Sequence, residues 1–232
     1  VRWSNEDAAR ISALLLAVII FQAVLGMWTV IWLVKPIIVM AHLMGGLLTF
    51  SMLTWLAWRA TPNTELIQGI ARPLKTALWL GLALLAVQIA LGGWTSANYA
   101  ALACGTDYPK CLGQWLPAHD FREGFVLWRG IGVDYEGGVL DGPARVAIQL
   151  AHRGMALLVF GHLLVVAIRM IRTPGLVFWG SLLAVLLLAQ VALGISNVVL
   201  GLPLWVAVAH NAGAALLLFA VVGLLARLRA PE

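Results

Sequence analysis

Three histidines stand at equivalent places in otherwise apolar stretches of the chain. They are His42 in IVMAHLMGGLLTF (38–50), His152 in QLAHRGMALLVF (149–160) and His210 in VAVAHNAGAALLLF (206–219). An imidazole in an apolar helix costs free energy unless another group binds it. Because the same residue recurs in the same setting, we expect the three side chains to bind a ligand rather than to be separately tolerated core residues.

Haem is the ligand that this pattern favours. Zinc usually takes four donors, often with Cys or a carboxylate, and a proton or cation path normally carries Asp or Glu. The apolar stretches hold almost no carboxylates. Haem needs only one or two axial imidazoles and an apolar slot between helices. Gly45, Gly46 and Gly213 follow their histidines by about one turn and would let a flat macrocycle approach, although small residues also serve close helix packing.

The histidines belong to a unit that occurs three times. Each unit has a helix with Gln-x-x-Leu-Gly, a connection, and a helix with Ala-His. The first motif occurs in FQAVLGMWTV (21–30), VQIALGGWTS (87–96) and AQVALGISNV (189–198). Gln22 precedes His42 by 20 residues, and Gln190 precedes His210 by the same 20. Interhelical hydrogen bonding, rather than catalysis, is the expected role of the polar residues in these helices: Gln22, Gln88, Gln190, Ser196 and Asn197.

The composition indicates an all-α integral membrane protein. Of the 232 residues, 62% are hydrophobic and 11% are charged, whereas soluble domains carry about 25% charged residues. Six stretches reach the ~18 apolar residues that a membrane helix needs: 11–34, 36–58, 76–97, 146–168, 177–200 and 204–226. We expect six transmembrane helices whose paired units form antiparallel four-helix bundles. The net charge of +5 is better explained by topology than by nucleic acid, and no nucleic-acid partner is expected.

The charges give an orientation. Basic residues flank the spans at the chain start, in 59–75, in 169–173 and after residue 226, which all fall on one side. The long loop 98–144, on the other side, holds six acidic and three basic residues. The positive-inside rule then places both termini in the cytoplasm of a bacterial inner membrane, with the loop outside. Each repeated histidine lies roughly 10 Å below that outer face.

Two cysteines, Cys104 and Cys111, lie in the outer loop. Because the outer face of a bacterium is oxidising, we expect them to form a disulfide. Its role is open at this point: a staple on the loop is the simpler interpretation, and a redox-active pair is the alternative. A metal site is not favoured, since two cysteines without paired histidines offer too few ligands.

Three further polar residues require separate interpretations. His162 is ten residues beyond His152, about 15 Å deeper and on a different helix face, so we expect it to serve helix packing. His119 is expected to be solvated or structural in the loop. Arg153 lies well inside a span, where it could pair with a haem propionate or extend to the interface.

Several motifs together resemble the haem A synthase family of bacterial and mitochondrial membranes, over essentially the whole chain. They are Gly26-Met27-Trp28-Thr29-Val30, Ala41-His42, Cys104 and Cys111 with Gly113-Gln114-Trp115, Ala151-His152-Arg153, Leu193-Gly194-Ile195-Ser196-Asn197 and Ala209-His210-Asn211. The resemblance implies an oxidoreductase that converts haem O to haem A for terminal cytochrome oxidases, oxidising a ring methyl to a formyl group by successive hydroxylations. It also implies eight membrane helices in two similar four-helix halves.

The resemblance assigns roles to residues of the second half, 76–232. His152 and His210 would be the axial ligands of a haem b, and Cys104 and Cys111 would be the disulfide of the outer loop. This half would therefore be complete in the chain.

The first half differs from the family pattern. Residues 1–60 would be the remaining part of the substrate-haem bundle, joined to the second half by the cytoplasmic connection 61–75. His42 would be the second histidine of the substrate haem. The family's first two helices, the partner histidine and a nearby glutamate have no counterpart here, so we expect the chain to be a fragment, and its catalytic acid or base is unknown.

Two other functions are compatible with the residues. One is a bis-histidine haem b protein that transfers electrons without changing haem, and the other is a disulfide-exchanging membrane oxidoreductase centred on Cys104 and Cys111. The expected partners are membrane lipid, haem O as substrate, an unidentified electron donor, and oxidase-assembly proteins or a haem O synthase. Homo-oligomerisation is also possible.

Overall fold

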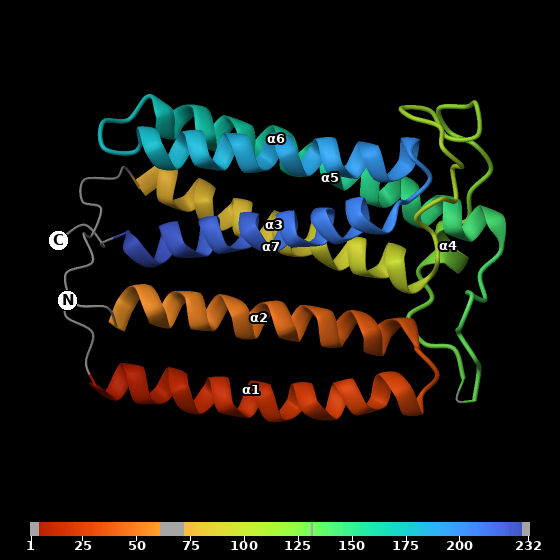
Figure 1. Cartoon of the computed structure of the whole chain (residues 1–232), viewed down its shortest axis with the longest axis horizontal. Coiled ribbons are helices and arrows are strands. Elements are labelled where there is room, and N and C mark those ends of the chain that lie inside the picture. Colours follow the sequence, from red (N-terminus) through yellow and green to blue (C-terminus); the bar gives the residue numbers. More distant parts are fainter. Residues whose placement is uncertain (1–4, 61–71, 131, 229–232) are drawn as a thin grey trace.

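The computed structural model describes residues 5–60, 72–130 and 132–228. Within them lie seven helices: α1 (Asn5–Ile31), α2 (Pro36–Ala60), α3 (Arg72–Ala97), α4 (Phe121–Gly124), α5 (Gly142–Ile171), α6 (Val177–Val199) and α7 (Leu204–Arg227). The six long helices lie side by side, and the long loop 98–141 sits at one end of them, hereafter the loop end (Figure 1). All six are long and apolar enough to cross a membrane, which confirms the six predicted spans.

Two helix ends differ from the sequence-based expectation. α1 ends at Ile31 rather than near residue 34, because Leu33 and Val34 adopt left-handed backbone angles, both with φ of 50°. α5 begins at Gly142, four residues before the expected apolar stretch. Its start is set by Asp141, whose side chain accepts a hydrogen bond from the N–H of Ala144 (2.9 Å), the arrangement of an N-cap.

Four helices form a closed ring. α3 contacts α5, α5 contacts α6, α6 contacts α7, and α7 contacts α3. Because α5 and α7 make no direct contact among the described residues, they occupy opposite corners of this bundle. The two histidine-bearing helices of the second half therefore face each other across its axis.

The buried core of the bundle lies toward the end away from the loop. On each of the four helices the core residues stop about one or two turns short of the repeated Gln or His. The last ones are Leu85 on α3, Val159 on α5, Leu187 on α6 and Leu217 on α7. A second, smaller buried cluster of Trp94, Ala100, Leu140, Ala144 and Ile148 closes the loop end. The Gln and His level lies between these two clusters.

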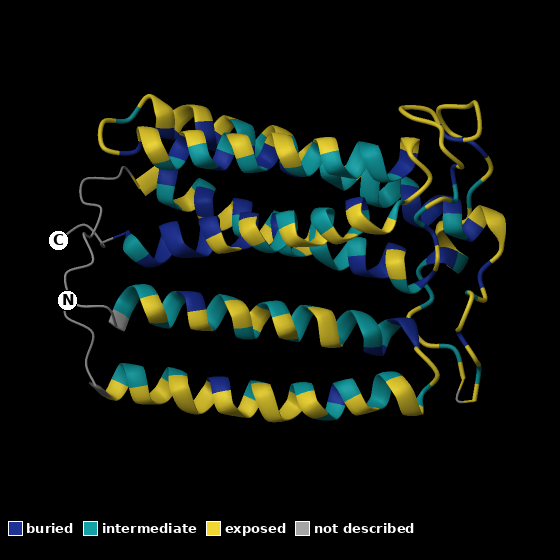
Figure 2. Ribbon diagram, in the orientation of Figure 1, coloured by how far each residue is buried: buried dark blue, intermediate teal, exposed yellow. Residues whose placement is uncertain are grey.

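The α1–α2 pair packs against the side of this bundle. α2 contacts α7 and α3, whereas α1 contacts α2 and no other described helix. Only 11% of the most apolar stretch of α2 is buried, against 44% for α7, and Figure 2 shows α1 and α2 exposed along much of their length. The pair thus presents a large apolar surface that none of the described helices covers.

Candidate functional site

In every unit the repeated glutamine reaches the repeated histidine across the helix pair. The Nε2 atom of Gln88 lies 3.2 Å from Nδ1 and 3.4 Å from Nε2 of His152. The Nε2 atom of Gln190 lies 3.5 Å from Nε2 of His210. These contacts join α3 to α5 and α6 to α7. The expected interhelical hydrogen bonding is confirmed for both glutamines, and its partners are the histidines themselves.

The pair in the first unit is more firmly held. Gln22 Nε2 donates to His42 Nδ1 (2.8 Å) and to the His42 carbonyl (2.9 Å), and its Oε1 accepts from the N–H of Gly46 (3.2 Å). The amide orientation follows from these contacts, since both of its atoms are satisfied only in this way. The Gln22 amide is therefore fixed by backbone groups of α2 as well as by the imidazole.

The glycine of each Gln-x-x-Leu-Gly motif leaves space for the imidazole ring. A Cβ atom at any of these glycines would lie closer to the ring's Cε1 than ordinary packing allows. The pairs are Gly26 against His42 (3.1 Å), Gly92 against His152 (3.2 Å) and Gly194 against His210 (3.0 Å). The sequence motif alone did not indicate a role for these glycines. Their constant position, four residues after each glutamine, was the signal that they face the histidine.

Glycines on the histidine-bearing helices leave space for the glutamine side chains. A Cβ at Gly45 would overlap the amide of Gln22, and one at Gly213 would overlap the amide of Gln190. Of the two interpretations that the sequence left open for these glycines, access for a macrocycle and close helix packing, the contacts with the glutamines support close packing. Gly46 has open space beside it.

Buried polar atoms without partners gather beside the two histidines of the four-helix bundle. The Oε1 atoms of Gln88 and Gln190 and the Nδ1 atom of His210 are buried without a hydrogen-bond partner. Buried polar atoms are normally paired. Two imidazoles on opposite corners, between two packed clusters and with unpaired polar atoms beside them, fit a group held by axial nitrogens.

His42 is placed differently. Its side chain is exposed on α2. The two remaining histidines, His162 and His119, each hydrogen-bond a backbone carbonyl. His162 Nε2 donates to the Ala77 carbonyl (2.8 Å), which is the predicted packing role. His119 Nδ1 donates to the Pro117 carbonyl (2.8 Å) in the loop, as expected. Among the described residues, the side chain that hydrogen-bonds the His42 ring is Gln22.

Arg153 and the two cysteines form one structural group. Cys104 and Cys111 are joined by a disulfide, as predicted, and both are buried against Val146 of α5. Arg153 donates to the carbonyls of Lys110 (2.9 Å) and Asp107 (3.0 Å), so it fastens the disulfide loop to α5. Its Nε is buried without a partner.

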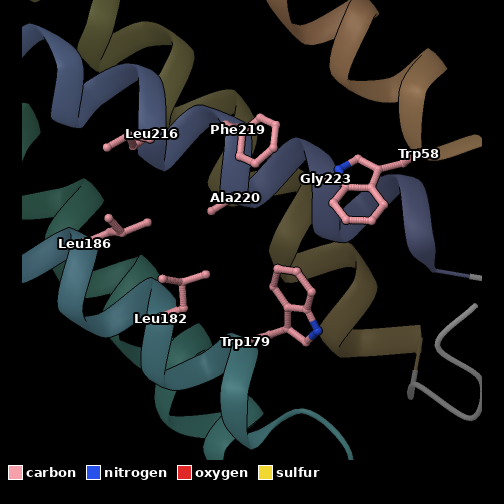
Figure 3. Close-up of a pocket in the computed structure, with 8 residues that line it drawn as sticks. All are labelled: Trp58, Trp179, Leu182, Leu186, Leu216, Phe219, Ala220 and Gly223. Atoms are coloured by element: carbon pink, nitrogen blue, oxygen red, sulfur yellow. The ribbon is translucent and has the colours of Figure 1, made fainter. Parts of the chain in front are cut away.

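An apolar pocket lies away from the histidines. It measures about 210 Å³ and lies between α2, α6 and α7, toward the end opposite the loop (Figure 3). At that end the guanidinium of Arg227 lies 4.8 Å from the Trp58 ring and 4.9 Å from the Trp179 ring.

Within the described residues no group of three His, Cys, Asp or Glu could hold a metal ion.

Fold and site define a multi-pass membrane protein in which helix pairs present glutamine-supported histidines. The chain belongs to the COX15-CtaA family of cytochrome oxidase assembly proteins, whose sequence profile matches residues 1–222.

Several known proteins are similar to this chain in sequence. The haem A synthase of Shewanella oneidensis is 44% identical over 205 residues, which cover 88% of this chain and 62% of the relative. That of Rhizorhabdus wittichii is 34% identical over 186 residues, covering 78% of this chain and 48% of the relative. That of Methylobacterium radiotolerans is 33% identical over 180 residues, covering 77% and 46%. The chain therefore spans about half to three fifths of the length of these relatives.

Proposed function

We propose that this chain is part of a haem A synthase, which oxidises a ring methyl of haem O to the formyl group of haem A. The observation that carries the proposal is the placement of His152 and His210. They lie on opposite corners of the bundle, at the level where the packed core ends, in a chain whose family and relatives are those named above.

His152 and His210 are the proposed axial ligands of a haem b. A haem bound there supplies one-electron redox chemistry, while the protein sets its position and potential. If both imidazoles ligated a haem, they would hold it for electron transfer or structure and would leave the oxidation to the other haem. Arg153, whose Nε is unpaired near the loop end, is the proposed partner of a propionate.

His42 is the proposed ligand of the substrate haem. Residues 1–60 then form the remaining part of the substrate bundle, 61–75 the connection, and 76–232 the haem b bundle. The second imidazole for the substrate haem, and the acid or base of the reaction, would come from residues outside this chain. The exposed face of α2 that carries His42 is where such residues would pack. An electron donor is required in addition.

The proposed location is a bacterial inner membrane with both termini in the cytoplasm. α1 begins and α7 ends at the same end of the molecule, opposite the long loop (Figure 1). That arrangement supports a common side for the termini and an outer position for the disulfide loop.

The test uses the full-length protein that contains this chain, expressed in membranes that make haem O. Haem extracted from the membranes should contain haem A or its hydroxylated intermediate, and His152→Ala or His210→Ala should abolish the b-type reduced-minus-oxidised spectrum. Membranes with only haem B and haem O would contradict the synthase and favour an electron-transfer protein. Loss of function in Cys104→Ser, with function retained in both histidine variants, would favour a disulfide-exchanging enzyme.

A further inference from the structure

A groove runs along α7 between α2 and α6. Both of these helices contact α7, but among the described helices they make no contact with each other, so α7 forms the floor and its two neighbours form the walls. The groove is the apolar pocket of about 210 Å³ (Figure 3). Leu216 and Phe219 of α7 line it and are still 52% and 40% exposed. The groove is therefore open sideways, toward the surroundings of the spanning helices.

One end of the groove carries two aromatic rings and a cation. Trp58 lies two residues before the end of α2, and Trp179 is the third residue of α6. The guanidinium of Arg227, the last residue of α7, lies 4.8 Å from the first ring and 4.9 Å from the second. Tryptophan and arginine at the ends of spanning helices mark the interface between membrane and water. This end of the groove therefore lies at the level of the lipid headgroups.

The rest of the groove offers only hydrocarbon. Figure 3 shows Leu186 and Leu216 at the end of the pocket away from the two tryptophans, and from Arg227 back to Leu216 the helix rises about 16 Å. The indole nitrogens of Trp58 and Trp179 are the only polar side-chain atoms among the described residues that line the pocket. A ligand with oxygen atoms deep in the groove would leave them without hydrogen-bond partners, whereas an acyl chain needs none.

The charge at this end favours an anionic partner. The acidic side chains among the described residues here are Glu6 and Asp7, in the first turn of α1. The described basic side chains at the same end are Arg10, Arg59, Arg72, Lys75, Arg169, Arg172 and Arg227. Basic pockets between membrane helices bind the phosphate headgroups of anionic lipids. An apolar groove that ends at a cation thus has the form of an amphiphile with a hydrocarbon chain and a phosphate.

We propose that this groove binds an anionic phospholipid, with an acyl chain between α2 and α6 and the phosphate beside Arg227. The lipid would bridge α2 and α6, which do not touch each other, and so join the α1–α2 pair to the four-helix bundle at the end away from the loop. This inference goes beyond the proposed function and does not depend on it, because it uses no histidine and no haem.

The test uses the full-length protein that contains this chain, stripped of lipid in detergent and studied by native mass spectrometry. Dioleoylphosphatidylglycerol and dioleoylphosphatidylcholine are added at equal concentrations, so the two probes share their acyl chains and differ in headgroup charge. The protein should retain phosphatidylglycerol about fivefold more tightly, the preference that one basic residue near a membrane surface provides. Phosphatidylglycerol should also raise the melting temperature, because a ligand of the folded state stabilises it.

Variants of Arg227 test the headgroup site. Arg227→Gln should lose the preference for phosphatidylglycerol, and Arg227→Lys should restore most of it, because an ammonium group also binds phosphate as a point charge. Arg169→Gln is the matched control, since it removes a charge from an exposed side chain in the last turn of α5 at the same end. This control should keep the preference.

A second pair of variants tests the groove itself. Leu186→Trp places a large ring in the groove, so it should abolish the retention of both lipids and the rise in melting temperature. Leu188→Trp adds the same bulk to α6 at a position that is 54% exposed and does not line the groove. This variant should bind both lipids as the wild type does.

Four outcomes would overturn the proposal. Equal retention of the two lipids by the wild type would mean that the groove does not recognise charge. Equal losses in Arg227→Gln and Arg169→Gln would assign the effect to the net charge of this end, and unchanged retention in Leu186→Trp would place the lipid elsewhere. Displacement of phosphatidylglycerol by an equal concentration of ubiquinone would identify a neutral isoprenoid as the occupant. Because no haem is measured, failure of the proposed function would leave these results unchanged.

Discussion

The ammonium group of Lys35 lies 3.4 Å from the centroid of the Trp128 ring, and it donates to the carbonyl of Gly130 (2.8 Å). Lys35 belongs to the turn between α1 and α2, whereas Trp128 belongs to the long loop before α5. Only 3% of the Lys35 side chain is exposed, and burial lowers its pKa below the usual value. The cation is thus enclosed by an aromatic ring and a carbonyl, and it joins the two parts of the chain at the loop end.

Replacing Lys35 should release this part of the loop. Lys35→Met keeps the length of the side chain but removes the charge and leaves the Gly130 carbonyl without its donor, at a cost of about 1–3 kcal/mol. Hydrogen exchange at the Tyr135 amide, which donates to the Leu33 carbonyl (3.2 Å), should then become faster. Unchanged exchange at Tyr135 would show that the lysine does not hold the loop.

The loop should also respond to high pH through Tyr135. Burial raises the pKa of this phenol above its ordinary value, although the nearby charge of Arg129 opposes the effect. An acid whose pKa is raised by folding stabilises the fold below its unfolded pKa, near 10, and that stability is lost as pH rises through the folded pKa. Ultraviolet titration should show one of the three tyrosines ionising late, and Tyr135→Phe should remove that phase. If the late phase persists in the variant, Tyr135 is not its source.

Much of this arrangement could be predicted from sequence because it depends on length, hydropathy and spacing. The repeated spacing indicated that Gln22 and Gln190 form interhelical hydrogen bonds, but it did not identify the histidines as their partners. The contact of Lys35 with Gly130 could not be predicted, since 95 residues separate them and no periodicity relates a turn to a loop. The early end of α1 could not be predicted either, because the apolar residues Leu33 and Val34 suit a helix as well as a turn.

The glycines beside the histidine rings should be intolerant of even one added methyl group. In Gly194→Ala the Cβ would stand 3.0 Å from Cε1 of His210, so the ring must move away from its present position, and we expect a cost of about 1–3 kcal/mol with reduced haem b content. Gly154→Ala is the control, since nothing lies within 4 Å of its Cβ. Equal haem content in both variants would show that the space beside His210 is not needed for haem.

Removing the disulfide should weaken the loop without changing the haem spectrum. Cys104 and Cys111 are seven residues apart, and closing so short a loop stabilises a fold by about 2–3 kcal/mol in the chain-entropy account. The double variant Cys104→Ser, Cys111→Ser should lower the melting temperature and expose the loop to protease, while haem A formation continues. Loss of haem A formation in a variant that remains folded would instead indicate a redox role for the pair.

The contact between α2 and the bundle should depend on Gly223 of α7. A Cβ there would meet Nε1 of Trp58 at 2.8 Å, so in Gly223→Ala the indole must shift in the space it shares with Trp179 and Arg227. We expect a loss of about 1–3 kcal/mol, seen as a lower melting temperature in detergent. The haem b spectrum should survive, because Gly223 lies at the end of α7 remote from His210.

Gly161→Ala, with open space at its Cβ, controls for the effect of an added methyl group in a membrane helix. Equal melting temperatures for the two variants would mean that Trp58 does not fix α2 against α7, and a lost spectrum would mean that the two halves are coupled through this contact.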